Sequence, residues 1–310
     1  MNYYLGVDAG GTKTHTLIVD ENDQIVGEYT SGPGNPTSIG IEEAIDNIFE
    51  SIIAAKLKAE QGTGRKQLPI ISSCIGLAGL DTDKDKVILT SVLEKLFYKL
   101  KLKTPIIVND VQIGLKSATD NKNAMAIICG TGSNLFGQND QGKEVKVGGL
   151  EYLLSDEASG YYIGYKALRL AAKSYDGRVK KSVLEDLIVS ELQVENMRDA
   201  KNIVQNYKKK DFAHLVYIVF EAFRQGDWGA IQIVNETVEE GFLMIKTAVD
   251  KLKYTKSFDI VYIGGLFENT NFATKMSEKI HSEFPLANII FHKKAPAWGA
   301  IQMAKEVPAS

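Results

Sequence analysis

The stretch that decides the fold is Gly6-Val7-Asp8-Ala9-Gly10-Gly11-Thr12-Lys13-Thr14, which joins an apolar strand to an acidic, glycine-rich turn and then to a second strand. Its glycines let backbone N–H groups approach an anion, and a carboxylate beside a phosphate requires a cation between the two charges. Asp8 is therefore expected to hold Mg²⁺, directly or through water. The alternative is a hairpin whose glycines serve only the turn.

The same stretch narrowly misses the P-loop pattern G-x-x-x-x-G-K-[ST], because Thr12 separates Gly11 from Lys13. A P-loop also opens a helix, whereas residues 14–19 alternate as a strand does. The sequence therefore predicts a phosphate-binding hairpin in place of a P-loop.

Composition narrows the class of protein. The chain has 310 residues, a formal net charge of -3 and two cysteines. Interspersed charges give no general attraction to nucleic acid or anionic lipid, and no apolar run approaches the ~20 residues of a membrane span, so we expect a cytoplasmic protein. Cys74 and Cys129 lie in apolar runs and are expected in the core. The basic run at residues 208–210 is interpreted as a solvated helix end or loop.

One pattern occurs twice: strand, glycine turn, strand, acidic turn, strand. The first copy begins at Gly6, and the second begins near Ala126 with the turn Gly130-Thr131-Gly132-Ser133. In each copy two strand–helix units follow. They are expected at residues 70–79 with 84–98 and 106–108 with 111–118 in the first half, and at 260–265 with 271–284 and 289–291 with 295–304 in the second.

This repeat predicts an α/β protein of two domains, each a mixed five-stranded sheet flanked by helices, with a cleft between the domains. The first domain is expected over residues 1–118, completed by the C-terminal helix at 295–310. The second is expected over residues 119–294, with a helical insertion between 157 and 253. A ligand cleft with a glycine hairpin on either wall would also require a hinge.

Five blocks of the sequence stand in an order that matches a known family. They are residues 6–14, Val108-Asn109-Asp110, residues 130–133, Gly148-Gly149 with residues 155–161, and Gly264-Gly265-Leu266-Phe267. In these blocks the chain resembles the N-acetylglucosamine kinase and BadF/BadG/BcrA/BcrD ATPase-like family of the sugar kinase, heat-shock ATPase and actin superfamily. The resemblance implies that both domains have the ribonuclease H-like (actin-like ATPase) fold.

The resemblance implies a role for each matching residue. Asp8 would orient hydrated Mg²⁺, and Asp110 would be the general base that accepts the sugar hydroxyl proton. Asn35 and Asp156 would contact the sugar, near Gly149. The ATP contacts would come from Gly10, Gly11, Thr12, Lys13, Thr131, Gly132, Gly264 and Gly265.

The residue chemistry agrees with these roles and also offers structural alternatives. A base within reach of the acceptor adds ~10²–10⁴-fold to the rate, and Asp110 follows an apolar strand where partial burial can raise its pKa. Asp110 and Asp156 could equally be helix N-caps, and Asn35 could serve only its turn. Tyr161, Tyr162 and Tyr165 recur at helical spacing, which favours core packing over sugar stacking.

The chain departs from the family at its Gly-Gly-Trp-Gly block, which here reads Gly148-Gly149-Leu150-Glu151. An aliphatic residue replaces an aromatic one near the sugar pocket, and a carboxylate replaces a glycine. Glu151 could bind a hydroxyl or an amino group, or point to solvent. The missing Trp is compatible with a wider pocket, although the added negative charge argues against an acidic sugar.

The predicted function is an ATP- and Mg²⁺-dependent kinase for the 6-hydroxyl of N-acetylglucosamine or a related amino sugar or hexose, with N-acetylmuramate, glucosamine and glucose as further candidates. The family commonly forms dimers, so a homodimer is expected by analogy. Two alternatives are a BadF-like activator ATPase, which bridges an iron–sulfur cluster with cysteines at its dimer interface, and an actin-like assembly protein.

Overall fold

Across residues 1–80, 83–292 and 294–307, which this computed structural model describes, the strands form two five-stranded sheets. The chain packs as two compact units, one of residues 1–120 with 291–310 and one of residues 121–290. The sequence placed these divisions at residues 118 and 294.

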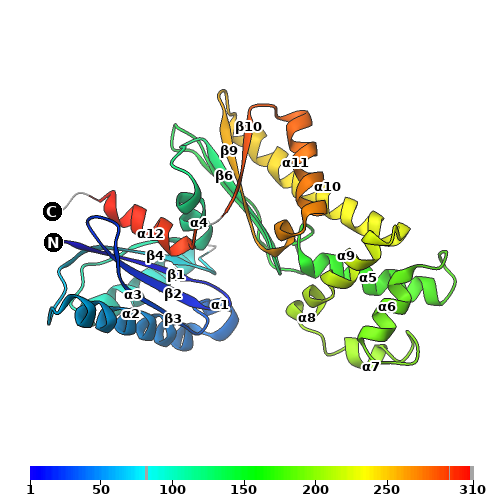
Figure 1. The fold of residues 1–310 in the computed structure, drawn as a ribbon, viewed down its shortest axis with the longest axis horizontal. Helices are drawn as coiled ribbons and strands as arrows, with labels where there is room; N and C mark the ends of the chain where they lie inside the picture. The colour runs from blue at the N-terminus through cyan, green and yellow to red at the C-terminus, as the bar shows by residue number, and fades with distance from the viewer. Residues whose placement is uncertain (81–82, 293, 308–310) are drawn as a thin grey trace. The chain divides into compact units, whose positions relative to one another are not determined.

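The first unit is a mixed sheet in the order β3-β2-β1-β4-β5 (Figure 1). Strand β1 pairs antiparallel with β2 and parallel with β4, and β5 continues the parallel part. Its elements are β1 (Tyr3–Ala9), β2 (Thr14–Asp20), β3 (Ile25–Ser31), α1 (Pro36–Ile39), α2 (Ile41–Thr63), β4 (Ile70–Leu77), α3 (Asp83–Lys99), β5 (Ile106–Asn109), α4 (Asp110–Ala118) and α12 (Pro296–Lys305).

Helices cover both faces of this sheet (Figure 1). Alternate residues of β1, such as Leu5 and Val7, pack with α2 and α3 in one cluster, while Cys74 of β4 packs with α4 and α12 on the other face. Every residue of β2 is buried, so this strand does not alternate between core and solvent as the sequence suggested. Burial of both faces is the reason.

The C-terminal helix α12 lies against β1 and α4 because two glycines permit very close approach. A β-carbon at Gly6 would lie 2.5 Å from the carbonyl oxygen of Ala297, and one at Gly299 would lie 1.8 Å from that of Ile113. Real β-carbons do not approach backbone oxygens so closely, so glycine is required at both places. The last helix of the chain is thereby fixed to the first unit.

The second unit repeats the topology of the first. Its sheet has the order β10-β9-β6-β7-β8. Read in the opposite direction, from β8 to β10, this sheet has the third, second, first, fourth and fifth strands of the unit side by side. The first sheet has the same arrangement. Strand β6 pairs antiparallel with β7 and parallel with β9, as β1 does with β2 and β4. The strands are β6 (Ala124–Cys129), β7 (Ser133–Gln138), β8 (Glu144–Gly148), β9 (Phe258–Ile263) and β10 (Ala287–Phe291). The predicted duplication and fold class are confirmed.

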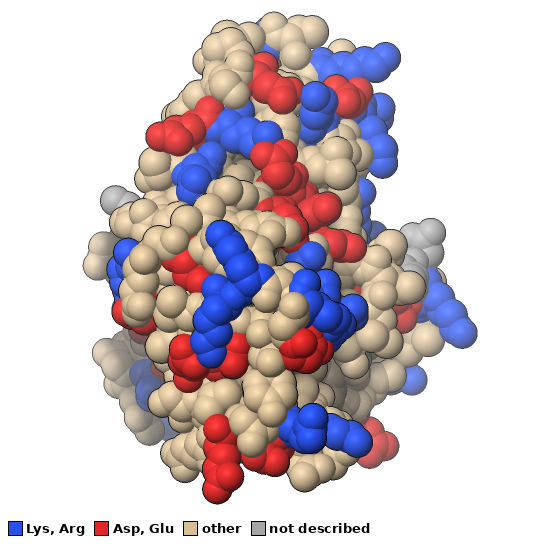
Figure 2. All heavy atoms as spheres, turned by 90° about the vertical axis from the view of Figure 1, so that its right-hand side faces the viewer, with Lys and Arg blue, Asp and Glu red and all other residues tan. Residues whose placement is uncertain are grey.

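A helical insertion enlarges the second unit. The helices are α5 (Gly160–Tyr175), α6 (Val183–Glu191), α7 (Lys201–Val204), α8 (Lys209–His214), α9 (Val216–Arg224) and α10 (Trp228–Leu252), followed after β9 by the 3₁₀ turn η1 (Gly265–Glu268) and α11 (Thr270–Glu283). On the face seen in Figure 2, acidic and basic side chains are interspersed. Among the described residues no helix is long and apolar enough to cross a membrane.

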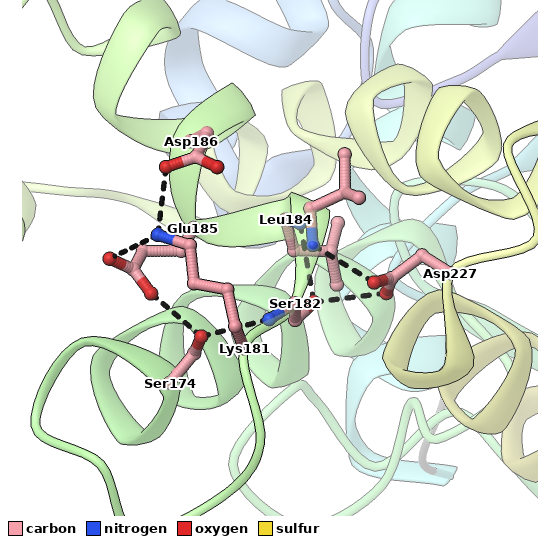
Figure 3. A network of polar contacts seen from close by, with 8 residues as sticks. Ser174, Lys181, Ser182, Leu184, Glu185, Asp186 and Asp227 are labelled. Carbon is pink, nitrogen blue, oxygen red and sulfur yellow. Dashed lines mark hydrogen bonds and ion pairs between the residues drawn. The ribbon is translucent and has the colours of Figure 1, made fainter.

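A buried polar network joins three of these helices (Figure 3). Asp227 caps α10 through the N–H groups of Gly229 and Ala230, and it also accepts hydrogen bonds from the Ser182 hydroxyl and the Val183 N–H. Ser174 of α5 donates to Glu185 of α6 at 2.6 Å. A carboxylate that accepts several backbone N–H bonds is well satisfied although buried, so the insertion has a fixed arrangement.

Candidate functional site

In the first unit the candidate residues gather at one edge of the sheet. Strands β1, β4 and β5 run parallel, and their last residues, Ala9, Leu77 and Asn109, are paired side by side. The carboxyl ends of parallel strands are where open α/β sheets bind ligands. The loops that leave these ends carry the predicted residues.

The loop between β1 and β2 is a tight hairpin. The N–H of Gly10 donates to the carbonyl of Lys13 at 3.0 Å, and the N–H of Gly34 donates to the carbonyl of Gly10 at 2.8 Å. Space beside Gly11 is open, and Thr12 and Lys13 are exposed. The turn therefore presents unobstructed backbone to an incoming anion.

Asp8 and Asp110 lie near each other at this edge, and both are half-buried. Burial first, and then the negative charge of Asp110, raise the pKa of Asp8 to about 7, while the positive charge of Lys13 partly offsets them. Two carboxylates that disfavour each other's ionised form are stabilised together by a cation. This edge is thus suited to a metal ion.

Asp110 is the first residue of α4 but does not cap it. Asn109 is the N-cap: its side chain accepts from the N–H of Val111, and Gln112 completes a capping box by accepting from the N–H of Asn109. The N-cap alternative for Asp110 is therefore wrong. Because Asn109 performs that task, N-capping does not explain the carboxylate of Asp110 at this edge.

Asn35 lies at the same edge and does cap a helix. Its Oδ1 accepts from the N–H and the hydroxyl of Thr37, at 2.9 and 2.7 Å, at the start of α1. A β-carbon at Gly79, after β4, would lie 2.5 Å from the same oxygen. The turn interpretation thus holds for Oδ1, while the amide nitrogen Nδ2 is the group of Asn35 that a sugar hydroxyl could meet.

The second unit has its own glycine loop at the equivalent place, between β6 and β7. The N–H of Gly130 donates to the carbonyl of Gly132 at 3.0 Å, and the N–H of Gly160 donates to the carbonyl of Gly130 at 2.8 Å. These bonds correspond to those of Gly10 in the first unit. Thr131 is exposed, and space beside Gly130 is open.

The Gly264–Gly265 turn lies next to this loop. Gly264 has φ +104°, and a β-carbon there would lie 2.5 Å from the carbonyl oxygen of Cys129, so the position requires glycine. Beside Gly265 the space is open. The end of β9 and the end of β6 thus form one edge, as β4 and β1 do in the first unit.

Asp156 also lies at this loop but is not the cap of α5, because the N-cap is Ser159 and the helix begins at Gly160. The N-cap alternative is therefore wrong for Asp156 as well. Its Oδ1 accepts from the N–H of Ser133 at 2.7 Å, and its Oδ2 lies 2.7 Å from Nζ of Lys209. The solvated interpretation of residues 208–210 fits Lys208 and Lys210, which are exposed, but is wrong for Lys209.

The segment that replaces the family's Trp block is a compact turn with an apolar surface. Gly149 packs against the Asn134 side chain, and the N–H of Leu150 donates to the Ser155 hydroxyl at 2.8 Å. Leu150, Leu153 and Leu154 are exposed. Beside them a hollow of about 330 Å³ is lined by Tyr152, Leu153, Leu154, Ser155, Asp156, Glu157, Tyr161, Tyr162 and Tyr165.

Tyr161, Tyr162 and Tyr165 of α5 are half-buried and line this surface hollow. The expectation that they pack in the core is therefore wrong. The rings of Tyr161 and Tyr165 stack with centroids 5.9 Å apart, and Tyr152 meets Tyr161 edge-on at 4.9 Å. Such an aromatic surface suits the apolar face of a sugar ring.

The donor set of the first unit fits Mg²⁺. Within the described part of the chain, no three or more His, Cys, Asp or Glu side chains come together as a protein-only metal cage. Mg²⁺ usually keeps several waters and is held by one or two carboxylates together with substrate phosphates. Asp8, with Asp110 nearby, is such a partial donor set.

Comparison with known proteins agrees with this geometry. Residues 5–304 match the BadF/BadG/BcrA/BcrD ATPase family. The chain belongs to this family. Membership in an ATPase family implies that the chain binds ATP.

Two relatives are each 32% identical to the chain. One, from Clostridium acetobutylicum, is named N-acetylmuramic acid/N-acetylglucosamine kinase; the match covers 98% of this chain and 99% of that protein. The other, from Dictyostelium discoideum, is named N-acetyl-D-glucosamine kinase; the match covers 97% of this chain and 97% of that protein.

A solved structure supports the fold. A candidate N-acetylglucosamine kinase from Chromobacterium violaceum superposes with a TM-score of 0.76 at 19% identity, covering 97% of this chain and 98% of that one. The likeness confirms the two-domain actin-like ATPase fold.

The cysteines bear on the activator alternative. Both cysteines of the chain are fully buried, and burial raises the pKa of both thiols, that of Cys74 to about 12. Thiolates are the ligands of iron–sulfur clusters, and a cluster shared between two chains needs them at the surface. Cys74 and Cys129 therefore do not fit that role.

Proposed function

We propose that the chain is an ATP- and Mg²⁺-dependent kinase that phosphorylates the 6-hydroxyl of N-acetylglucosamine or a related amino sugar. The observation that carries the proposal is the pair Asp8 and Asp110 beside the Gly10–Lys13 hairpin. A metal-orienting carboxylate and a second carboxylate that acts as a base are what phosphoryl transfer to a hydroxyl requires. The names of the relatives point to the same reaction.

In this proposal each carboxylate has one task. Asp8 would hold Mg²⁺ through its water shell, and the bound ion would supply positive charge beside the phosphate oxygens. Asp110 accepts the proton of the attacking hydroxyl, a contribution of ~10²–10⁴-fold to the rate. The backbone at Gly10, Gly11, Thr131 and Gly132 and the side chains of Thr12 and Lys13 bind phosphate, and Gly264 and Gly265 lie beneath the adenosine.

The sugar is proposed to contact Asn35 through Nδ2, and Gly149 and Asp156 are proposed near it. Two features bear on which sugar is preferred. The aromatic hollow favours a sugar with an apolar substituent such as an N-acetyl group. Glu151 is 74% exposed and lies 3.8 Å from Lys209, so its charge is largely solvated and is a weaker barrier to an acidic sugar than its sequence position suggests.

A coupled assay of ADP release tests the proposal across N-acetylglucosamine, N-acetylmuramate, glucosamine and glucose, with ATP and Mg²⁺. We expect turnover that depends on sugar, is greatest with an N-acetylated amino sugar, and yields the 6-phosphate by ³¹P NMR. Omission of Mg²⁺ should abolish it. Absence of sugar-dependent ADP release with all four sugars would contradict the proposal.

The same proposal includes a homodimer, as the family resemblance implies, and a cytoplasmic location, as the composition of the sequence implies. Light scattering coupled to gel filtration measures the mass: a value near twice that of the 34.1 kDa chain supports the dimer, and a value near that of one chain opposes it.

A further inference from the structure

Asp156 is an unusual carboxylate because it is buried yet lies beside a loop proposed to bind anions. Its side chain is 3% exposed. Oδ1 accepts the N–H of Ser133, which ends the loop of residues 130–133, and so anchors that loop. The backbone of Asp156 has φ +102°, a conformation that is unfavourable for a non-glycine residue and persists only where the surroundings impose it.

Lys209 supplies the charge that opposes Asp156. Its Nζ lies 2.7 Å from Oδ2 of Asp156, in an ion pair whose angles do not make it a hydrogen bond. Lys209 is the first residue of α8, which packs against α5. A β-carbon at Gly132 would lie 2.7 Å from the same Nζ, so the ammonium directly adjoins the loop.

The position of this pair decides the charge that an incoming phosphate meets. A buried carboxylate without its partner would place a negative charge within contact distance of the loop, where screening by solvent is weak. Juxtaposed like charges weaken recognition. With Lys209 in place the pair is neutral, and the anchor on Ser133 is kept without repelling phosphate.

We propose that Lys209 is a positioning residue for nucleotide binding, whose ammonium cancels the charge of Asp156 so that loop 130–133 stays anchored and still accepts phosphate. The inference rests on the proposed nucleotide site at this loop. It also gives Asp156 a role in anchoring the loop, because contact between Oδ2 and a sugar hydroxyl would require Lys209 to move.

The test measures the Kd of Mg²⁺·AMP-PNP by calorimetry for five proteins: wild type, Lys209→Met, Lys209→Arg, the double variant Asp156→Asn with Lys209→Met, and Lys210→Met. Lys209→Met should raise Kd about tenfold or more, because it leaves Asp156 uncompensated. The double variant removes both charges while Asn can still accept from Ser133, and should return Kd to within about threefold of wild type.

Lys210→Met is the matched control, since the neighbouring lysine is exposed, and its Kd should stay within about twofold of wild type. Lys209→Arg keeps the charge and should recover most of the affinity. Wild type that binds no nucleotide would contradict the proposed function. If wild type binds nucleotide and Lys209→Met binds it with the same Kd, this inference is overturned while the proposed function stands.

Two further outcomes are decisive. If Lys209→Met and the double variant both bind nucleotide with the same raised Kd, the inference is wrong. Lys209 would then act by direct contact with phosphate or by supporting α8. If Lys209→Met does not fold, the double variant carries the test: affinity like wild type supports the inference, and a loss of about tenfold overturns it.

Discussion

At the scale of single residues, Asp8 links the metal site to the pH dependence of stability. Its pKa is raised to about 7 in the folded chain by burial and by Asp110. The folded state therefore binds this proton more tightly than the unfolded state does, and the resulting stability is complete below about pH 4 and lost as pH rises through about 7. Without metal, the melting temperature of wild type should fall relative to that of Asp8→Asn between pH 5 and pH 8. Parallel melting profiles for the two proteins across that range would show that Asp8 has an ordinary pKa.

At the scale of elements, the close approach of α12 to α4 depends on Gly299. A β-carbon there would lie 1.8 Å from the Ile113 carbonyl oxygen and 2.7 Å from the Ser117 nitrogen, which are backbone atoms that cannot move aside. Gly299→Ala should lower the free energy of unfolding by about 1–3 kcal/mol or more, measured by urea denaturation. Gly62→Ala is the control, because Gly62 lies in α2 with its nearest neighbour atom 3.9 Å away; alanine there should be neutral or stabilising by up to ~1 kcal/mol. Equal effects of the two substitutions would contradict the role given to Gly299.

At the scale of the whole molecule, the duplicated topology gives two units that the chain connects twice, after residue 120 and after residue 290. Each unit has its own core and its own glycine loop, so the two can move as bodies while their internal packing is unchanged. Kinases of this kind are expected to close around sugar and exclude water. The radius of gyration from small-angle scattering should therefore fall when N-acetylglucosamine saturates the protein, and glycerol at the same concentration should have no effect. An unchanged radius at saturation would argue against closure.

The sequence predicted the strands, their grouping into two sheets and most helices, because apolar periodicity and glycine turns are local signals. It also indicated Asp8 and Asp110, whose positions follow from strand ends. It did not indicate Lys209, because that residue lies in a basic run whose neighbours are solvated, and only the packing of α8 on α5 brings it to Asp156. The N-cap alternatives for Asp110 and Asp156 are wrong for a similar reason: Asn and Ser are also suitable cap residues, and only the backbone geometry shows that Asn109 and Ser159 are the caps.

The central claim is phosphoryl transfer to an amino sugar with Asp110 as the base, and one measurement tests it most directly: ADP release from ATP and N-acetylglucosamine by wild type and by Asp110→Asn. We predict sugar-dependent turnover in wild type and a kcat lower by ~10²–10⁴-fold in Asp110→Asn, with the Kd of Mg²⁺·AMP-PNP retained. An Asp110→Asn protein that turns over N-acetylglucosamine as fast as wild type would contradict the account.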